Sequence, residues 1–279
     1  MEYIEVLESW MEVRGLTDYS KKLYRWVSED FLRFCRSRGL AVDKNAVKEY
    51  LASLNISPGN KQWRWRILKR CFEVWGLEWF SNIEEAYIRP KPQERVSRPF
   101  LTIQEFMKLY EVADKDWVRL ALRIVAETGA RRIQVAILMR EHFNPDKRTL
   151  YIPPVKRSLE RVEVLSGELT RNLSEYLKNR LDDDEHLLVD ENGRPITLHK
   201  MNNEFRRLKK KTGINVKGLG FHGLRRSWAT WLYERGMRER EIQEAGGWKS
   251  MSMVSIYTRL SAPASVRKEL ELHPLKGQE

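Results

Sequence analysis

The chain has 279 residues, enough for two ordinary domains, and 42% of them are hydrophobic, so it can bury a core and is not a disordered chain. Lysine and arginine outnumber the acidic residues by 51 to 39, a formal charge of +12. This excess favours a polyanionic partner, because neutralised phosphates release counterions. An anionic membrane surface is the weaker alternative. The sequence contains no apolar run long enough to span a bilayer and no signal-peptide core, which argues against a membrane protein.

The two cysteines, Cys35 and Cys71, lie in apolar helical patterns. Neither belongs to a C-x-x-C pair or stands beside a histidine at a metal-ligand spacing, which argues against a zinc site and against a disulfide framework. We therefore expect buried free thiols, a reducing cytoplasmic environment, and neither a structural metal nor a cofactor.

The first domain is predicted over residues 1–88 and is nearly all helical. Apolar residues recur at three- and four-residue steps, as in Val27, Phe31 and Phe34. Residues 89–99 contain three prolines and little apolar content, so they are predicted to form a linker.

A helix that starts at Ser57-Pro58-Gly59 carries cations interleaved with tryptophans. The functional interpretation is a helix laid against a DNA groove, with its cations on phosphates. The alternative is a solvated charged face over a tryptophan-lined core. The predicted DNA-binding residues are Lys61, Arg64, Arg66, Lys69 and Arg70.

The second domain is predicted over residues 100–279. An apolar helix over residues 117–127 ends at Gly129, and two β-type runs, 149–155 and 161–165, flank a polar turn. Helical patterns then return. These elements predict a mainly α fold with a small antiparallel β-sheet. The later helical segments are 167–180, 197–211, 222–235, 238–245 and 250–259, with an amphipathic tail over 264–272.

Two arginine motifs stand out. Thr128-Gly-Ala-Arg131 places a guanidinium just after a glycine-terminated helix, where it and the next helix N-terminus can face one anion. The pattern His222-Gly-Leu-Arg225 puts two basic groups on one helix face, whereas Arg226 is expected to face solvent. Taken singly, each motif also fits a surface arginine or a capping histidine.

Three further residues complete the series. Lys156 lies in the turn between the predicted strands, where a long ammonium side chain can swing into a site. Gly246-Gly247-Trp248 ends a helix, and Tyr257 follows within Ile-Tyr-Thr-Arg. In isolation Lys156 is an ordinary turn lysine, and Tyr257 is an ordinary core tyrosine with a satisfied hydroxyl.

Taken together, the ordered motifs T-G-x-R, a turn lysine, H-x-x-R, G-G-W and I-Y-T-R resemble the active-site series of the tyrosine recombinases, the phage-integrase-like enzymes. The resemblance covers residues 100–260. The first 88 residues resemble the helical core-binding domain of that family, in character more than in motif. The resemblance implies a two-domain architecture, a helical DNA-binding domain followed by a mixed α/β catalytic domain.

The resemblance also implies a mechanism. Tyr257 would be the nucleophile that forms a covalent 3′-phosphotyrosyl intermediate, which stores the bond energy and makes ATP unnecessary. Arg131 and Arg225 would bind the non-bridging oxygens of the phosphate, a bidentate task that suits arginine better than lysine.

By the same family pattern, Lys156 would protonate the leaving 5′-oxygen, His222 would accept or relay the tyrosine proton, and Trp248 would donate its indole N–H towards the phosphate. The chain departs from the family at two positions. Trp248 stands where many relatives have histidine, and Gln134 stands where an acidic residue is common.

The implied function is site-specific recombination of double-stranded DNA by a homotetramer on two DNA sites, without metal and without a small-molecule substrate. We expect a cytoplasmic, nucleoid-associated protein. Two alternatives remain at this point: a type IB topoisomerase that relaxes supercoils without choosing a site, and a DNA-binding protein whose catalytic residues are vestigial.

Overall fold

The computed structural model describes residues 2–82, 84–85, 100–155, 158–216 and 218–258, and the side chains within these ranges except those of residues 253 and 256–258. The chain divides into two compact units, residues 1–96 and 97–279. The predicted linker, residues 89–99, lies outside the described residues, so its bounds stay a prediction.

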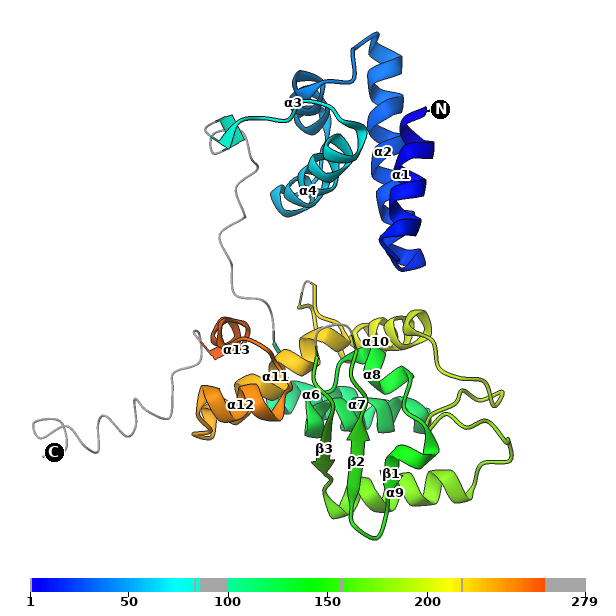
Figure 1. Ribbon diagram of the computed structural model, residues 1–279. Coiled ribbons are helices and arrows are strands. Elements are labelled where there is room, and N and C mark those ends of the chain that lie inside the picture. Colours follow the sequence, from blue (N-terminus) through cyan, green and yellow to red (C-terminus); the bar gives the residue numbers. More distant parts are fainter. Residues whose placement is uncertain (1, 83, 86–99, 156–157, 217, 259–279) are drawn as a thin grey trace, which may run out of the picture. The chain divides into compact units, whose positions relative to one another are not determined.

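The first unit is a bundle of helices (Figure 1). Helix α2 begins after Thr17, whose hydroxyl accepts the N–H of Ser20, and ends at Gly39 in the left-handed conformation. Both cysteines are free and buried in the core of the first unit, as predicted. The helices are α1 (Glu2–Val13), α2 (Asp18–Arg38), α3 (Lys44–Ser53) and α4 (Pro58–Trp75).

The second unit is also mainly helical, and α7 and α11 pack against each other within it. α7 is amphipathic: its buried residues include Leu120, Ile124 and Val125, whereas Arg119 and Arg123 lie on its polar face. α6 starts with a capping box of Thr102 and Glu105. The helices are α6 (Ile103–Glu111), α7 (Asp116–Thr128), α8 (Arg132–Ala136), the short 3₁₀ turn η1 (Arg140–His142), α9 (Gly167–Lys178), α10 (Leu198–Thr212), α11 (Phe221–Glu234), α12 (Glu239–Ala245) and α13 (Met251–Thr258).

Within the described residues, three strands form one antiparallel sheet in the order β1-β2-β3. The strands are β1 (Phe143–Asn144), β2 (Thr149–Ile152) and β3 (Arg161–Val164). The mainly α fold with a small antiparallel sheet is therefore confirmed. β1 was not predicted, because two residues are too few to show an alternating pattern.

At one end of the second unit, α12 and α13 pack on each other and on α11 (Figure 1). Their shared core consists of Trp228, Ala229, Ile242, Trp248 and Val254. α13 is therefore held in place through the buried side chain of Val254. In the described part of the chain, no helix combines the length and apolar character needed to cross a bilayer.

Candidate active site

The candidate site is built on the C-terminal end of α7, residues 127–129, which we call the platform. Gly129 ends the helix with φ of 61°, a conformation that favours glycine. A Cβ atom at this position would also clash with the ring of Trp228 on α11. The glycine of the T-G-x-R motif is therefore needed both for the turn and for the close approach of α11.

Three consecutive backbone carbonyls at this helix end each accept a hydrogen bond from a side chain distant in sequence. Trp228 Nε1 donates to the carbonyl oxygen of Glu127 at 3.0 Å, and Arg161 Nη2 donates to that of Thr128 at 2.8 Å. Arg225 Nη1 donates to the third, that of Gly129. The last carbonyls of a helix lack partners within the helix and carry partial negative charge, so two guanidinium groups suit this position.

Arg225 brings three of the predicted motifs together. Its side chain is buried, with 2% of the residue exposed. Besides its bond to Gly129, its Nη2 donates to the carbonyl oxygen of Gly246 at 2.6 Å, and its guanidinium lies 3.9 Å from the ring centroid of Trp248. A desolvated cation–π contact of this kind is worth about 2 kcal/mol. The guanidinium is thus fixed in orientation by groups from T-G-x-R and G-G-W.

The prediction for Arg226 was wrong. This residue is 6% exposed, not solvent-facing. The physical reason is that α11 is surrounded by α7, α10, α12 and α13, so more than one of its faces is covered.

The G-G-W motif forms a tight turn beside the sheet. A Cβ atom at Gly246 would clash with the ring of Trp248, which lies against this glycine. Gly247 has φ of 60°, and a Cβ atom there would stand 3.3 Å from the carbonyl oxygen of Leu159 and 3.5 Å from Arg161 Nη1. The two glycines therefore allow Trp248 to fold back and the turn to approach the segment that leads into β3.

Arg131 occupies the N-cap position of α8, two residues after Gly129. Gln134 is buried and accepts the backbone N–H of Arg131 at 2.9 Å, while its own amide donates to the carbonyl of Pro153 at 2.7 Å. Gln134 therefore ties the Arg131 backbone to the segment after β2. As a neutral amide it supplies no negative charge to the site.

The remaining predicted site residues are described only in part. His222 is exposed in the first turn of α11, three residues before Arg225. Lys156 lies outside the described residues. Tyr257 lies in α13, but its side chain is outside the described part of the structure.

Arg161 was missed by the sequence analysis, although its side chain donates to the platform carbonyl of Thr128. A signal was present in the sequence. In β3, Val162 and Val164 are exposed, while the charged residues Arg161 and Glu163 are more buried. Charged residues at alternate positions of a strand share one face, and valines on the other face mark an inverted pattern.

The predicted DNA-binding residues of α4 fall into three groups by exposure. Arg64 is buried, with its guanidinium bonded to Asp30 at 2.5 Å and stacked 4.3 Å over Trp26, so it packs inside the first unit and does not present its charge to a partner. Arg66 and Arg70 are exposed. The other two, Lys61 and Lys69, are half-buried, and Lys69 pairs with Glu85.

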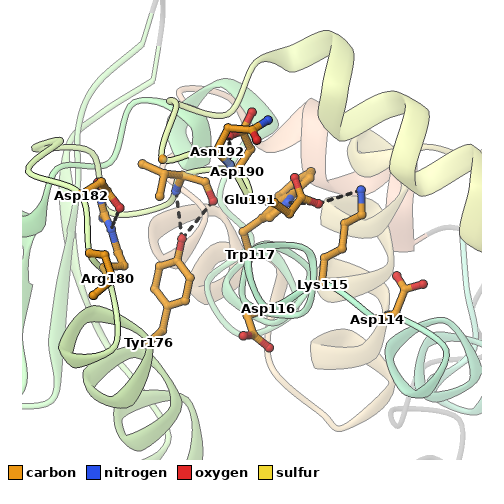
Figure 2. Close-up of a pocket in the computed structure, with 13 residues that line it drawn as sticks. Asp114, Lys115, Asp116, Trp117, Tyr176, Arg180, Asp182, Asp190, Glu191 and Asn192 are labelled. Atoms are coloured by element: carbon orange, nitrogen blue, oxygen red, sulfur yellow. Dashed lines mark hydrogen bonds and ion pairs between the residues drawn. The ribbon is translucent and has the colours of Figure 1, made fainter.

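A separate cavity of about 670 Å³ lies in the second unit and is lined by charged residues (Figure 2). Its charges are matched locally: Lys115 bonds Glu191 at 2.8 Å, and Arg180 bonds Asp182. None of the predicted catalytic residues lines it. Within the described residues no group of acidic, histidine and cysteine side chains is placed to hold a metal ion.

Comparison with known proteins identifies the family. The phage integrase family matches residues 99–263, more than half of the chain. The chain belongs to this family. It is therefore a tyrosine recombinase, an enzyme of site-specific DNA recombination.

This tyrosine recombinase is similar to tyrosine recombinase XerA of Pyrococcus furiosus, with 29% identity over 94% of this chain and 90% of the relative. The fold is similar to the crystal structure of XerA recombinase, with 22% identity, a TM-score of 0.56, and coverage of 98% of this chain and 99% of the other. It is also similar to a lambda integrase dimer bound to a COC′ core site, with 20% identity, a TM-score of 0.74, and coverage of 92% and 94%.

Proposed function

We propose that this tyrosine recombinase cleaves and rejoins double-stranded DNA at specific sites through a covalent intermediate on Tyr257. The observation that carries the proposal is the convergence at Arg225, where the carbonyls of Gly129 and Gly246 and the ring of Trp248 meet one guanidinium. These groups come from three separate motifs of the family series. They hold the Arg225 guanidinium in a fixed orientation, and an oriented guanidinium is suited to binding a phosphodiester.

The proposed step conserves phosphodiester bonds. The Tyr257 oxygen attacks the phosphorus, a phosphotyrosyl bond forms, and the bond between phosphorus and the 5′-oxygen breaks. The phenol proton leaves with attack, and the 5′-oxygen departs as a hydroxyl after it gains a proton. Rejoining reverses these steps when a 5′-hydroxyl attacks the phosphotyrosyl linkage, so neither ATP nor an external nucleophile is needed.

The other predicted residues divide the remaining tasks. Arg131 and Arg225 neutralise the non-bridging oxygens, where charge grows in the transition state. Lys156 gives the proton to the 5′-oxygen. His222 takes up the phenol proton, for which an imidazole with a pKa near neutral is suited. Trp248 donates its indole N–H towards the phosphate, and its ring packs against the Arg225 guanidinium.

We further propose that the exposed cations of α4, Arg66 and Arg70, contact DNA phosphates together with Lys61 and Lys69. Arg64 has a different role, because it is buried against Asp30. The lambda integrase structure, a dimer on a core site, supports binding of DNA by more than one copy. A homotetramer on two sites in the cytoplasm, associated with the nucleoid, is the assembly that we propose for strand exchange.

The proposal is tested with a nicked duplex that carries the cognate site, from which a short fragment is lost after cleavage so that the adduct is trapped. We expect the wild type to form a covalent protein–DNA adduct and Tyr257→Phe to bind the same DNA without forming one. An adduct with Tyr257→Phe would overturn the assignment of the nucleophile. Relaxation of a supercoiled plasmid without recombined product would instead indicate a topoisomerase.

A further inference from the structure

Arg161 and Glu163 form a largely buried ion pair directly beside the platform. Arg161 Nε bonds Glu163 Oε1 at 2.5 Å, and the two side chains are 9% and 18% exposed. Both residues belong to β3 and lie on one face, because they alternate with exposed valines. The face of β3 that the pair occupies is therefore turned towards the interior of the unit.

The position of Arg161 links three parts of the site. Its Nη2 donates to the carbonyl of Thr128, next to the Gly129 carbonyl that receives Arg225. Its Nη1 lies at van der Waals distance, 3.5 Å, from the point where a Cβ atom of Gly247 would stand. The guanidinium of Arg161, a residue of β3, thus contacts the end of α7 and borders the turn that carries Trp248.

Burial works against the charged forms of both members of the pair. Burial lowers the pKa of Arg161, although the negative charge of Glu163 favours the protonated guanidinium. Burial likewise raises the pKa of Glu163, against the opposing effects of Arg161 and, more weakly, of Arg225. In both groups the loss of hydration outweighs the attraction between the partners. When a buried ion pair is replaced by neutral residues, the protein is often as stable as before or more stable.

We infer that Arg161 and Glu163 are positioning residues of the cleavage reaction, with Glu163 as the carboxylate that balances two buried guanidiniums and keeps Arg225 on the Gly129 carbonyl. The inference rests on the proposed function. Gln134, a buried residue three positions after Arg131, is neutral and already bonded to Arg131 and Pro153. Glu163 therefore supplies to the platform a negative charge that Gln134 does not.

The test compares Glu163→Gln with Glu160→Gln. Glu160 is exposed, lies three residues earlier in the chain, and bonds Tyr151 outside the platform, so its variant removes a carboxylate without touching the pair. Three quantities are measured for each: the single-turnover rate of adduct formation, the Kd for uncleaved site DNA, and the thermal unfolding midpoint.

For Glu163→Gln we expect cleavage on the order of 100-fold slower, because small displacements of a catalytic group cost about that much. Its Kd should stay within about twofold of wild type, and its unfolding midpoint should be unchanged or higher. Glu160→Gln should match wild type in all three. Arg161→Lys should recover part of the rate that Arg161→Gln loses, because lysine retains a charge beside Glu163.

The inference is overturned if Glu163→Gln cleaves as fast as Glu160→Gln. It is also overturned if the midpoint of Glu163→Gln falls and its cleavage rate returns to the wild-type value at lower temperature, since the role is then structural. Absence of any adduct from wild type would be a failure of the proposed function instead. In that event a crystal structure of Glu163→Gln decides: Arg225 displaced from the Gly129 and Gly246 carbonyls supports the inference, and Arg225 unmoved refutes it.

Discussion

Replacement of Arg225 by lysine tests the geometry of the platform without changing its charge. In the wild type the guanidinium donates to the carbonyls of Gly129 and Gly246 and stacks on Trp248. A lysine ammonium is a point charge that cannot reproduce the forked arrangement. At least one carbonyl then loses its partner inside the protein, which costs about 1–3 kcal/mol of stability.

The effect on cleavage should be larger than the effect on binding. Loss of one oriented donor to the transition state costs about 2.7–4 kcal/mol, so single-turnover cleavage should fall by about 100- to 1000-fold. The Kd for DNA should change only a few-fold, because many phosphate contacts share the binding energy. Both are measured on the nicked duplex, by adduct formation and by gel shift.

The matched control is Arg235→Lys, which makes the same exchange at an exposed position just beyond the end of α11. It should behave as wild type. The reasoning is refuted if Arg225→Lys cleaves within about threefold of wild type, or if its whole defect lies in DNA affinity.

Three further predictions follow from single contacts. Gly246→Ala places a methyl group against the ring of Trp248, so cleavage should slow at least about tenfold with DNA affinity retained; a rate within twofold of wild type contradicts this. Because burial raises the pKa of Glu163, the folded state binds its proton more readily than the unfolded chain. The unfolding free energy of wild type, minus that of Glu163→Gln, should therefore rise as pH falls from neutral towards about 4.3, and a flat difference contradicts it. Arg66→Met should lower the salt dependence of DNA binding by about one unit of slope without changing the unfolding midpoint, whereas Arg64→Met should lower the midpoint; the reverse pattern would show that Arg64 is the DNA contact.

Much of the fold was predictable because its signals are local. The end of α7 at Gly129, the capping box of Thr102 and the strands β2 and β3 each follow from a few neighbouring residues. The motif series was predictable for a different reason, namely that its order and spacing resemble a known family. Neither kind of signal shows how distant segments of the chain pack together around the site.

The unpredicted features all depend on packing between distant segments. The burial of Arg226 follows from helices that surround α11, and the burial of Arg64 follows from Asp30 and Trp26 on α2. The same holds for the platform: no local pattern indicates that Arg161 and Arg225 donate to adjacent carbonyls. The alternation of charged residues and valines in β3 was visible in the sequence. The contact of its charged face with the end of α7 was not.

The most direct test of the central claim is to identify the residue that carries DNA. The adduct trapped on the nicked duplex is digested with protease and nuclease, and the nucleotide-bearing peptide is sequenced by mass spectrometry. We predict a single modified residue, Tyr257, joined to a 3′-phosphate. A nucleotide on Tyr233, which packs beside the same cluster of α11 and α13, or on any other residue would contradict the account.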